Sequence, residues 1–233
     1  MNTDRSIGNM DTRVVKFHPT HSLGKLYLSE HNRPADWAEY LDAQGEVLVP
    51  PGMNLILRVT NDGLTDLTPL TRLEPDDLYA ISFACTRVKD DDLRFVQSLT
   101  HLHGLAIWET NIGDLALAHL SEMTSIRWLD LGDTKITDEG LARLRGLKGL
   151  QELALLNDGV GDNGVTHLAG FESLRRLDLM STRVSDTSIT SLRGLTGMRS
   201  LRIYQTQISE NGYAELSRAL PGCKIWYYRS NDL

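Results

Sequence analysis

The chain has 233 residues, of which 41% are hydrophobic and 24% are charged, with a formal net charge of −7 and a pI near 5.5. This composition allows a continuous apolar core but argues against a nucleic-acid groove, because affinity for phosphates depends on clustered Lys and Arg. No segment approaches the roughly 18 apolar residues of a membrane span, and the amino terminus lacks a signal-peptide pattern, so we expect a cytoplasmic protein that binds neither nucleic acid nor membrane.

Residues 1–53 do not repeat, and they predict a small β-rich amino-terminal cap. The segments RVVKFHP, LGKLYLSE and GEVLVP indicate short strands, because residues that favour strands are bounded there by Gly, Pro, His and Asn. Trp37, Tyr40 and Leu41 are expected to form a helical turn on the apolar side of this cap.

Residues 54–221 consist of seven 24-residue blocks without a single insertion. A fixed period in this range is typical of a solenoid, in which each repeat buries its apolar face against its neighbours. The blocks begin at Asn54, Leu78, Leu102, Ile126, Leu150, Leu174 and Met198.

The apolar positions within each block predict one strand and one short helix. Taking the first residue of a block as position 1, positions 4 and 6, such as Leu129 and Leu131, have the spacing of a strand with one side in the core. Positions 16, 19 and 22, such as Leu141, Leu144 and Leu147, follow one helical stripe.

Two polar columns accompany these apolar positions. An acid at position 13 is expected to cap the helix that begins there, and a calcium array is the weaker interpretation because calcium needs six to eight converging oxygens. The threonine at position 9 is expected to hydrogen-bond the backbone where the strand turns toward the helix. The acids are Asp66, Asp90, Asp114, Asp138, Asp162, Asp186 and Glu210; position 9 holds Thr86, Thr110, Thr134, Thr182 and Thr206, with Asp62 and Asp158 as variants.

The pattern LxxLxLxxTxITDxGLxxLxxL resembles the leucine-rich repeat, in the variant with Thr where many members carry Asn or Cys. It is similar to bacterial relatives of the ribonuclease-inhibitor-like and cysteine-containing repeat families. The resemblance implies an α/β right-handed solenoid with a parallel concave sheet, convex helices and protein recognition as its usual role. The first block, which has no leucine at position 1, departs from the pattern as an end repeat does.

Residues 222–233 predict a capping strand and tail. Ile225 and Tyr227 occupy core-facing positions, so a final strand at about residues 223–228 is expected to cover the edge of the sheet. Cys85 and Cys223 lie six stacked strands apart, about 29 Å, which excludes a disulfide between them and predicts two reduced thiols.

Positions 3, 5 and 7 are expected to face solvent on the concave sheet, and they are rich in aromatic and charged residues toward the carboxyl-terminal half. Exposed aromatics beside arginines are typical of interfaces, so we predict that an unidentified protein partner binds here. The alternative is that Leu156, Met180 and Tyr204 only pack across strands and that Asp178 and Arg202 form a surface ion pair. The predicted partner-binding residues are Trp108, Trp128, Asp130, Glu152, Leu156, Arg176, Asp178, Met180, Arg202, Tyr204, Trp226 and Tyr228.

Two other functions remain open. Asp130, Glu152 and Asp178 allow a carboxylate-based ligand-binding or hydrolytic solenoid, since position 5 places Asp130 and Asp178 roughly 9.6 Å apart, near the upper limit for an inverting glycosidase. A purely structural subunit of a homo-oligomer is the other, although we expect a monomer. His101 and His103 have no recognisable third ligand, so we predict no metal site. We also predict no cofactor and no enzyme activity.

Overall fold

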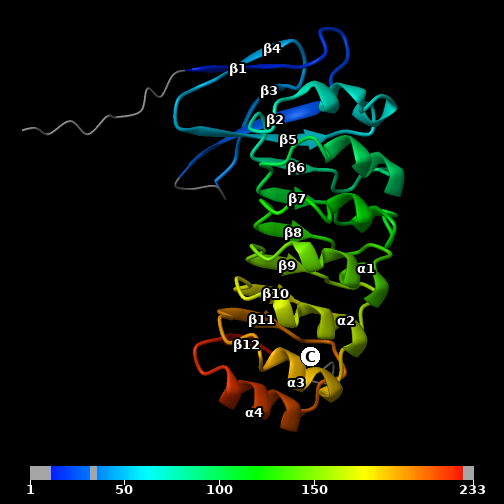
Figure 1. Cartoon of the computed structure of the whole chain (residues 1–233), viewed down its shortest axis with the longest axis vertical. Helices are drawn as coiled ribbons and strands as arrows, with labels where there is room; N and C mark the ends of the chain where they lie inside the picture. The colour runs from blue at the N-terminus through cyan, green and yellow to red at the C-terminus, as the bar shows by residue number, and fades with distance from the viewer. Residues whose placement is uncertain (1–11, 32–35, 228–233) are drawn as a thin grey trace, which may run out of the picture.

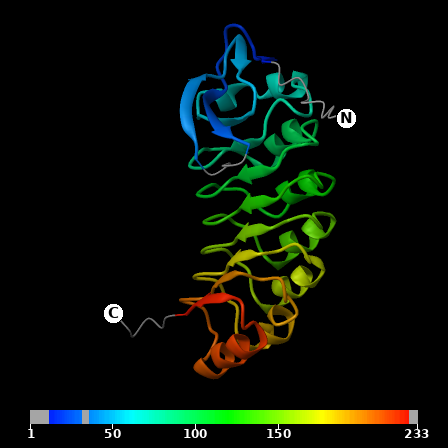
Figure 2. The same cartoon turned by 90° about the vertical axis from the view of Figure 1, so that its left-hand side faces the viewer.

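The computed structural model describes residues 12–31 and 36–227. Within these residues, one sheet has the strand order β12-β11-β10-β9-β8-β7-β6-β5-β2-β3, and β1 pairs with β4 in a separate ribbon. The strands stack along one side of the molecule and the helices along the other, with the amino-terminal strands at one end and α4 at the opposite end (Figures 1 and 2). This is an α/β solenoid.

The parallel part of the sheet follows the 24-residue period without a shift. Each strand residue pairs with the residue 24 positions further on, as in Trp128 with Glu152 and Leu129 with Leu153. The middle residues are buried, and Leu129 and Leu153 are each 2% exposed. The strands are β5 (Met53–Val59), β6 (Ala80–Ser82), β7 (Gly104–Ala106), β8 (Trp128–Asp130), β9 (Glu152–Ala154), β10 (Arg176–Asp178), β11 (Ser200–Arg202) and β12 (Lys224–Trp226).

The expected convex helices are present, but in the first three repeats they are 3₁₀ helices. An apolar residue at every third position is compatible with the three residues per turn of a 3₁₀ helix, and the later repeats combine a 3₁₀ helix with a short α-helix. The 3₁₀ helices are η1 (Gly63–Thr65), η2 (Thr68–Arg72), η3 (Asp90–Val96), η4 (Ala116–Leu120), η5 (Leu144–Gly146), η6 (His167–Gly170) and η7 (Asp186–Ser188). The α-helices are α1 (Asp138–Arg143), α2 (Asp162–Thr166), α3 (Ile189–Leu192) and α4 (Glu210–Ala219).

In five of the repeats the acid at position 13 bonds the next repeat, so the prediction that it caps its own helix was wrong there. Asp66 keeps the predicted role, because it accepts from the N–H and hydroxyl of Thr68 at the start of η2. Asp162 Oδ1 accepts from the backbone N–H of Ser185 at 2.8 Å, and its Oδ2 accepts from the Ser185 hydroxyl at 2.6 Å. Asp114 bonds the N–H and hydroxyl of Thr137 in the same way. The carboxylate therefore joins neighbouring repeats along the convex side. Asp90, Asp138 and Asp186 repeat this bond to the backbone of the following block.

The threonine column at position 9 hydrogen-bonds the backbone three residues earlier, as predicted. Thr110 Oγ1 donates to the Ile107 carbonyl at 2.7 Å, and the hydroxyls of Thr86, Thr182 and Thr206 make the equivalent bond. Thr134 is the exception, because its hydroxyl is 3.0 Å from Asp158 Oδ1 in the next block.

Position 8, one residue before this column, adopts the left-handed conformation in six repeats. The φ angles run from 54° to 59° although none of these residues is glycine. L-amino acids pay roughly 1–2 kcal/mol for this conformation, so the turn out of each strand carries repeated strain. The residues are Cys85, Glu109, Asp133, Asn157, Ser181 and Gln205.

The amino-terminal cap contains the three predicted strands, namely β1 (Arg13–Lys16), β2 (Gly24–Glu30) and β4 (Glu46–Val49). The helical turn predicted around Trp37, Tyr40 and Leu41 was wrong, because Tyr40 and Leu41 lie in a strand, β3 (Ala38–Asp42), and Trp37 directly precedes it. β3 pairs antiparallel with β2, whose other edge pairs with β5. Pairing with the free edge of β2 satisfies the backbone of β3, a non-local gain that overrides local helical spacing.

The final strand is present as β12 (Lys224–Trp226), and Ile225 and Tyr227 pack against the core as predicted. β12 is itself the last strand of the sheet, so it extends the edge and leaves its own outer side unpaired within the described residues. Tyr228 lies outside the described residues. Cys85 and Cys223 are both free thiols, as predicted. No helix in the described part of the chain is long and apolar enough to cross a bilayer.

Candidate partner-binding face

The outward face of the sheet changes character along the solenoid. At its amino-terminal end, Ile56 and Ala80 are fully buried, and Ser82 and Ala106 are only 6% and 7% exposed. The expectation that positions 3 and 5 face solvent is therefore wrong for these residues, although Arg58 at position 5 of the first repeat is exposed. From β8 onward positions 3 and 5 are half-buried or exposed in every strand, beginning with Trp128 and Asp130.

Trp128 lies across the strand that precedes it. A Cβ atom at Gly104, its direct partner in β7, would lie 1.9 Å from Cε2 of the indole, so only glycine leaves room for the ring there. Trp37 of the cap packs on the Trp128 ring with a centroid distance of 5.9 Å and an interplanar angle of 40°. The cap therefore contributes an aromatic side chain to the face of the repeats.

These side chains border a depression of about 450 Å³, here called the tryptophan pocket. Ser82 and Ala106, one on each of two adjacent strands, provide small residues within it. Trp108 stands at position 7 and is 36% exposed. The pocket is lined by Trp37, Ser82, Ala106, Trp108, Trp128, Asp130, Glu152 and Arg176.

A second depression of about 290 Å³ adjoins the tryptophan pocket and shares Trp128, Asp130, Glu152 and Arg176 with it. Its charged residues pair across neighbouring strands. Arg176 pairs with Glu152, and Arg202 Nη1 lies 3.0 Å from Asp178 Oδ2, so the predicted Asp178–Arg202 ion pair is present.

Asp130 differs from the other two carboxylates of this face. Its Oδ1 accepts from the backbone N–H of Gly132 at 3.2 Å, and no basic side chain of the described residues forms an ion pair with it. Burial raises the pKa of Asp130, and the negative charges of Asp178 and Asp133 add to the increase, although the Gly132 bond opposes it. Asp130 is thus a desolvated carboxylate without a counter-charge.

The remaining predicted residues lie further along the sheet. Leu156, Met180 and Tyr204 are half-buried, which fits packing across adjacent strands better than a fully exposed stripe. Trp226 carries the Lys224 ammonium 3.7 Å from its ring centroid and lines neither depression. The structure therefore brings five predicted residues together around the tryptophan pocket, namely Trp108, Trp128, Asp130, Glu152 and Arg176.

Sequence reasoning missed Trp37, which it assigned to the cap alone. Trp37 is 39% exposed, and Tyr27 of β2 lies 6.5 Å from it between ring centroids. A large aromatic in a segment without an apolar period was the available signal, since such a residue needs a partner from elsewhere in the fold.

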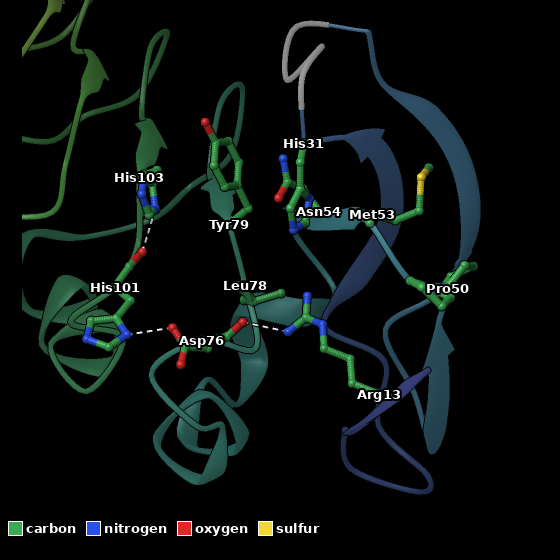
Figure 3. A pocket seen from close by; sticks show the side chains of 12 residues that line it. Arg13, His31, Pro50, Met53, Asn54, Asp76, Leu78, Tyr79, His101 and His103 are labelled. Carbon is green, nitrogen blue, oxygen red and sulfur yellow. Dashed lines mark hydrogen bonds and ion pairs between the residues drawn. The ribbon is translucent and has the colours of Figure 1, made fainter. Parts of the chain in front are cut away.

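A third depression, of about 440 Å³, lies where the cap meets the repeats (Figure 3). His101 Nδ1 lies 2.5 Å from Asp76 Oδ1, and His103 stacks on Tyr79 at 4.9 Å. Figure 3 shows His101 turned toward Asp76, on the opposite side of the depression from Met53 and Pro50. Among the described residues, no group of three or more His, Cys, Asp or Glu could hold a metal ion.

Comparison with solved structures identifies the fold. An internalin (inlF) of Listeria monocytogenes matches 71% of this chain with 25% identity and a TM-score of 0.58, and internalin C2 (inlC2) of the same species matches 67% with 25% identity and 0.51. A leucine-rich-repeat protein of Leptospira interrogans matches 64% with 19% identity and a TM-score of 0.50. The match covers 46%, 75% and 37% of those three chains, so this chain spans less than half of the inlF internalin. Comparisons with family models and with curated proteins gave no match.

Proposed function

The chain has the α/β leucine-rich-repeat fold, a solenoid built to present a long surface, and we propose that it is a non-enzymatic interaction module that binds a protein partner on its concave face. The observation that carries the proposal is the tryptophan pocket with its adjoining charged depression. Large aromatics beside arginines are enriched among residues that dominate binding energy. We further infer a cytoplasmic monomer that binds no nucleic acid and belongs to the ribonuclease-inhibitor-like repeat variant.

Partner capture followed by calorimetry tests this proposal. A partner isolated with the wild-type chain should bind Trp108→Ala or Tyr204→Ala variants more weakly by about 2 kcal/mol or more. Leu115→Ala is the matched control, because Leu115 is 67% exposed but lies on the helical side. Equal affinity of every concave variant for the partner would contradict the proposal and favour the helical side or the cap.

A hydrolytic function is the second candidate, and the raised pKa of Asp130 caused by burial favours it. A general acid needs such a shift, whereas Glu152 and Asp178 are each paired with an arginine. This candidate predicts that the chain hydrolyses chromogenic glycosides and that Asp130→Asn abolishes the turnover. Absence of turnover in the wild-type chain would eliminate it.

A purely structural role in a homo-oligomer is the third candidate. The cap exposes Val14, Leu41 and Leu48, which are 45%, 47% and 57% accessible. Solution mass measured over a concentration series distinguishes this role, since a monomer at all concentrations would exclude it.

A further inference from the structure

The tryptophan pocket combines flat aromatic walls with a small-residue interior. Trp128 and Trp37 contact each other at one side, and Trp108 stands at position 7 of the neighbouring repeat. Ser82 and Ala106 occupy position 5, where a larger side chain would fill the space. Gly104 is required for the Trp128 ring to lie where it does. Two independent features of the sequence, the glycine and the cap tryptophan, thus fix the aromatic wall.

The electrostatics of the pocket favour a cation. Indole faces carry negative electrostatic potential and attract cations placed over them. Asp130 follows Ala106 directly in the register of β7 and β8, and it lines the same pocket. Glu152 and Arg176 neutralise each other, so Asp130 supplies the net charge. Removing this carboxylate from water without a counter-charge is costly, and a bound cation would relieve that cost.

We propose that the tryptophan pocket binds an arginine side chain of the protein partner, with the guanidinium stacked on the indoles and hydrogen-bonded to Asp130. The inference rests on the proposed protein-binding function and specifies what the partner presents. Arginine fits better than lysine, because a planar guanidinium stacks on aromatic faces and presents paired N–H groups to a carboxylate, whereas an ammonium is a compact, strongly hydrated charge.

Small probes test the inference without the partner. The full chain is titrated with acetyl-Gly-Arg-Gly-amide and with the same peptide carrying citrulline, which keeps the planar shape but not the charge. Tryptophan fluorescence reports binding, because three tryptophans line the pocket. We expect the arginine peptide to bind at least tenfold more tightly than the citrulline peptide. Peptides with lysine and trimethyllysine in place of arginine should bind at least fivefold more weakly than the arginine peptide.

Variants then locate the site. Asp130→Asn should reduce the affinity for the arginine peptide at least fivefold and leave the citrulline peptide unaffected. Trp37→Leu should reduce it similarly, with circular dichroism confirming the fold. Asp91→Asn is the matched control, since the Asp91 side chain is 87% exposed on η3 at the helical side. It should leave the affinity unchanged.

Any one of three results would overturn the inference. The first is equal affinity for the arginine and citrulline peptides, and the second is tighter binding of the trimethyllysine peptide than of the arginine peptide. The third is no binding of the arginine peptide up to about 10 mM, which corresponds to a binding free energy of under 3 kcal/mol. The outcome is separable from that of the proposed function. A partner that loses affinity with Trp108→Ala while the arginine peptide does not bind would retain concave-face binding and reject the arginine pocket. An arginine peptide that binds while every concave variant keeps its partner affinity would reject the proposed function instead.

Discussion

Replacing Asp158 by asparagine should remove a pH-dependent instability from the centre of the solenoid. Asp158 is 5% exposed and occupies position 9, where most repeats have threonine. Its Oδ1 accepts from the Thr134 backbone N–H at 2.9 Å and from the Thr134 hydroxyl at 3.0 Å. Its Oδ2 is buried without a hydrogen-bond partner among the described residues. Asparagine keeps the first oxygen and removes the ionisable one.

The size of the effect follows from the pKa. Burial raises the pKa of Asp158 from 3.8 to about 7, with bonds from Thr134 opposing the shift and the charges of Asp133 and Asp130 adding to it. Between these two values the folded state holds the proton and the unfolded state releases it, so the free energy of unfolding falls as the pH rises. At 1.36 kcal/mol per pKa unit, the loss between pH 5 and full ionisation of Asp158 is about 3 kcal/mol. The loss is complete about one pH unit above 7.

Urea unfolding at pH 5, 6, 7 and 8, followed by circular dichroism, measures this loss. Asp158→Asn should become more stable than the wild type by about 3 kcal/mol on going from pH 5 to pH 8, relative to their difference at pH 5. The exposed Asp91→Asn variant controls for the loss of one charge and should run parallel to the wild type. Parallel curves for Asp158→Asn and the wild type would refute the assigned ionisation.

Three further substitutions test local features of the fold. Asp162→Ala removes the bonds to Ser185 of the next repeat and should lower the free energy of unfolding by about 3 kcal/mol. Asp66→Ala removes bonds that stay within its own exposed turn and should lower it by clearly less. Equal losses of the two variants in urea unfolding would argue against a bond between repeats. Glu109→Gly relieves the strain of a backbone φ of 55° and should stabilise the chain by up to about 1 kcal/mol. Glu109→Gln keeps a side chain at this position, and therefore the strain, so it should not stabilise the chain. Equal melting temperatures of the two variants would argue against backbone strain at this position. Gly104→Ala should displace the Trp128 ring and reduce the affinity for the arginine peptide at least fivefold in fluorescence titrations, with the fold intact. Gly222→Ala is the control and should not change this affinity, because a Cβ atom there would have open space around it. Full retention of affinity in Gly104→Ala would show that the Trp128 ring is not part of the arginine site.

The sequence predicted the features of the fold that recur in every 24-residue block. Leucines at positions 4 and 6 predicted the strands and their one-block register, and the structure has that register in every parallel pair. The domain boundaries at residues 53 and 221 stay predictions, since β5 pairs with both the cap strand β2 and the repeat strand β6.

The missed features depend on information that no single block contains. Position 8 holds six different residue types, so no residue preference indicated its left-handed backbone. The acids at position 13 predicted that each carboxylate accepts a bond from a backbone N–H group. The sequence did not show whether that group belongs to the helix that begins at the acid or to the next repeat, because a helix begins in both places. β3 was missed because its strand conformation depends on pairing with β2, which the spacing of the apolar residues within the segment does not report.

The candidate site lies where the chain departs from its own repeat. A periodic sequence specifies the same local structure in every block, so a residue that differs without disturbing the register is free to serve another purpose. Position 3 changes from alanine in β6 to glycine in β7 and tryptophan in β8, and position 5 changes from alanine in β7 to aspartate in β8. The glycine is explained by the ring that covers it. The aspartate accepts one backbone N–H bond, from Gly132, but it has no ion-pair partner among the described residues to offset its burial. A carboxylate that burial penalises, set beside a glycine and tryptophan pair that holds an aromatic wall, is better accounted for by a ligand than by the solenoid.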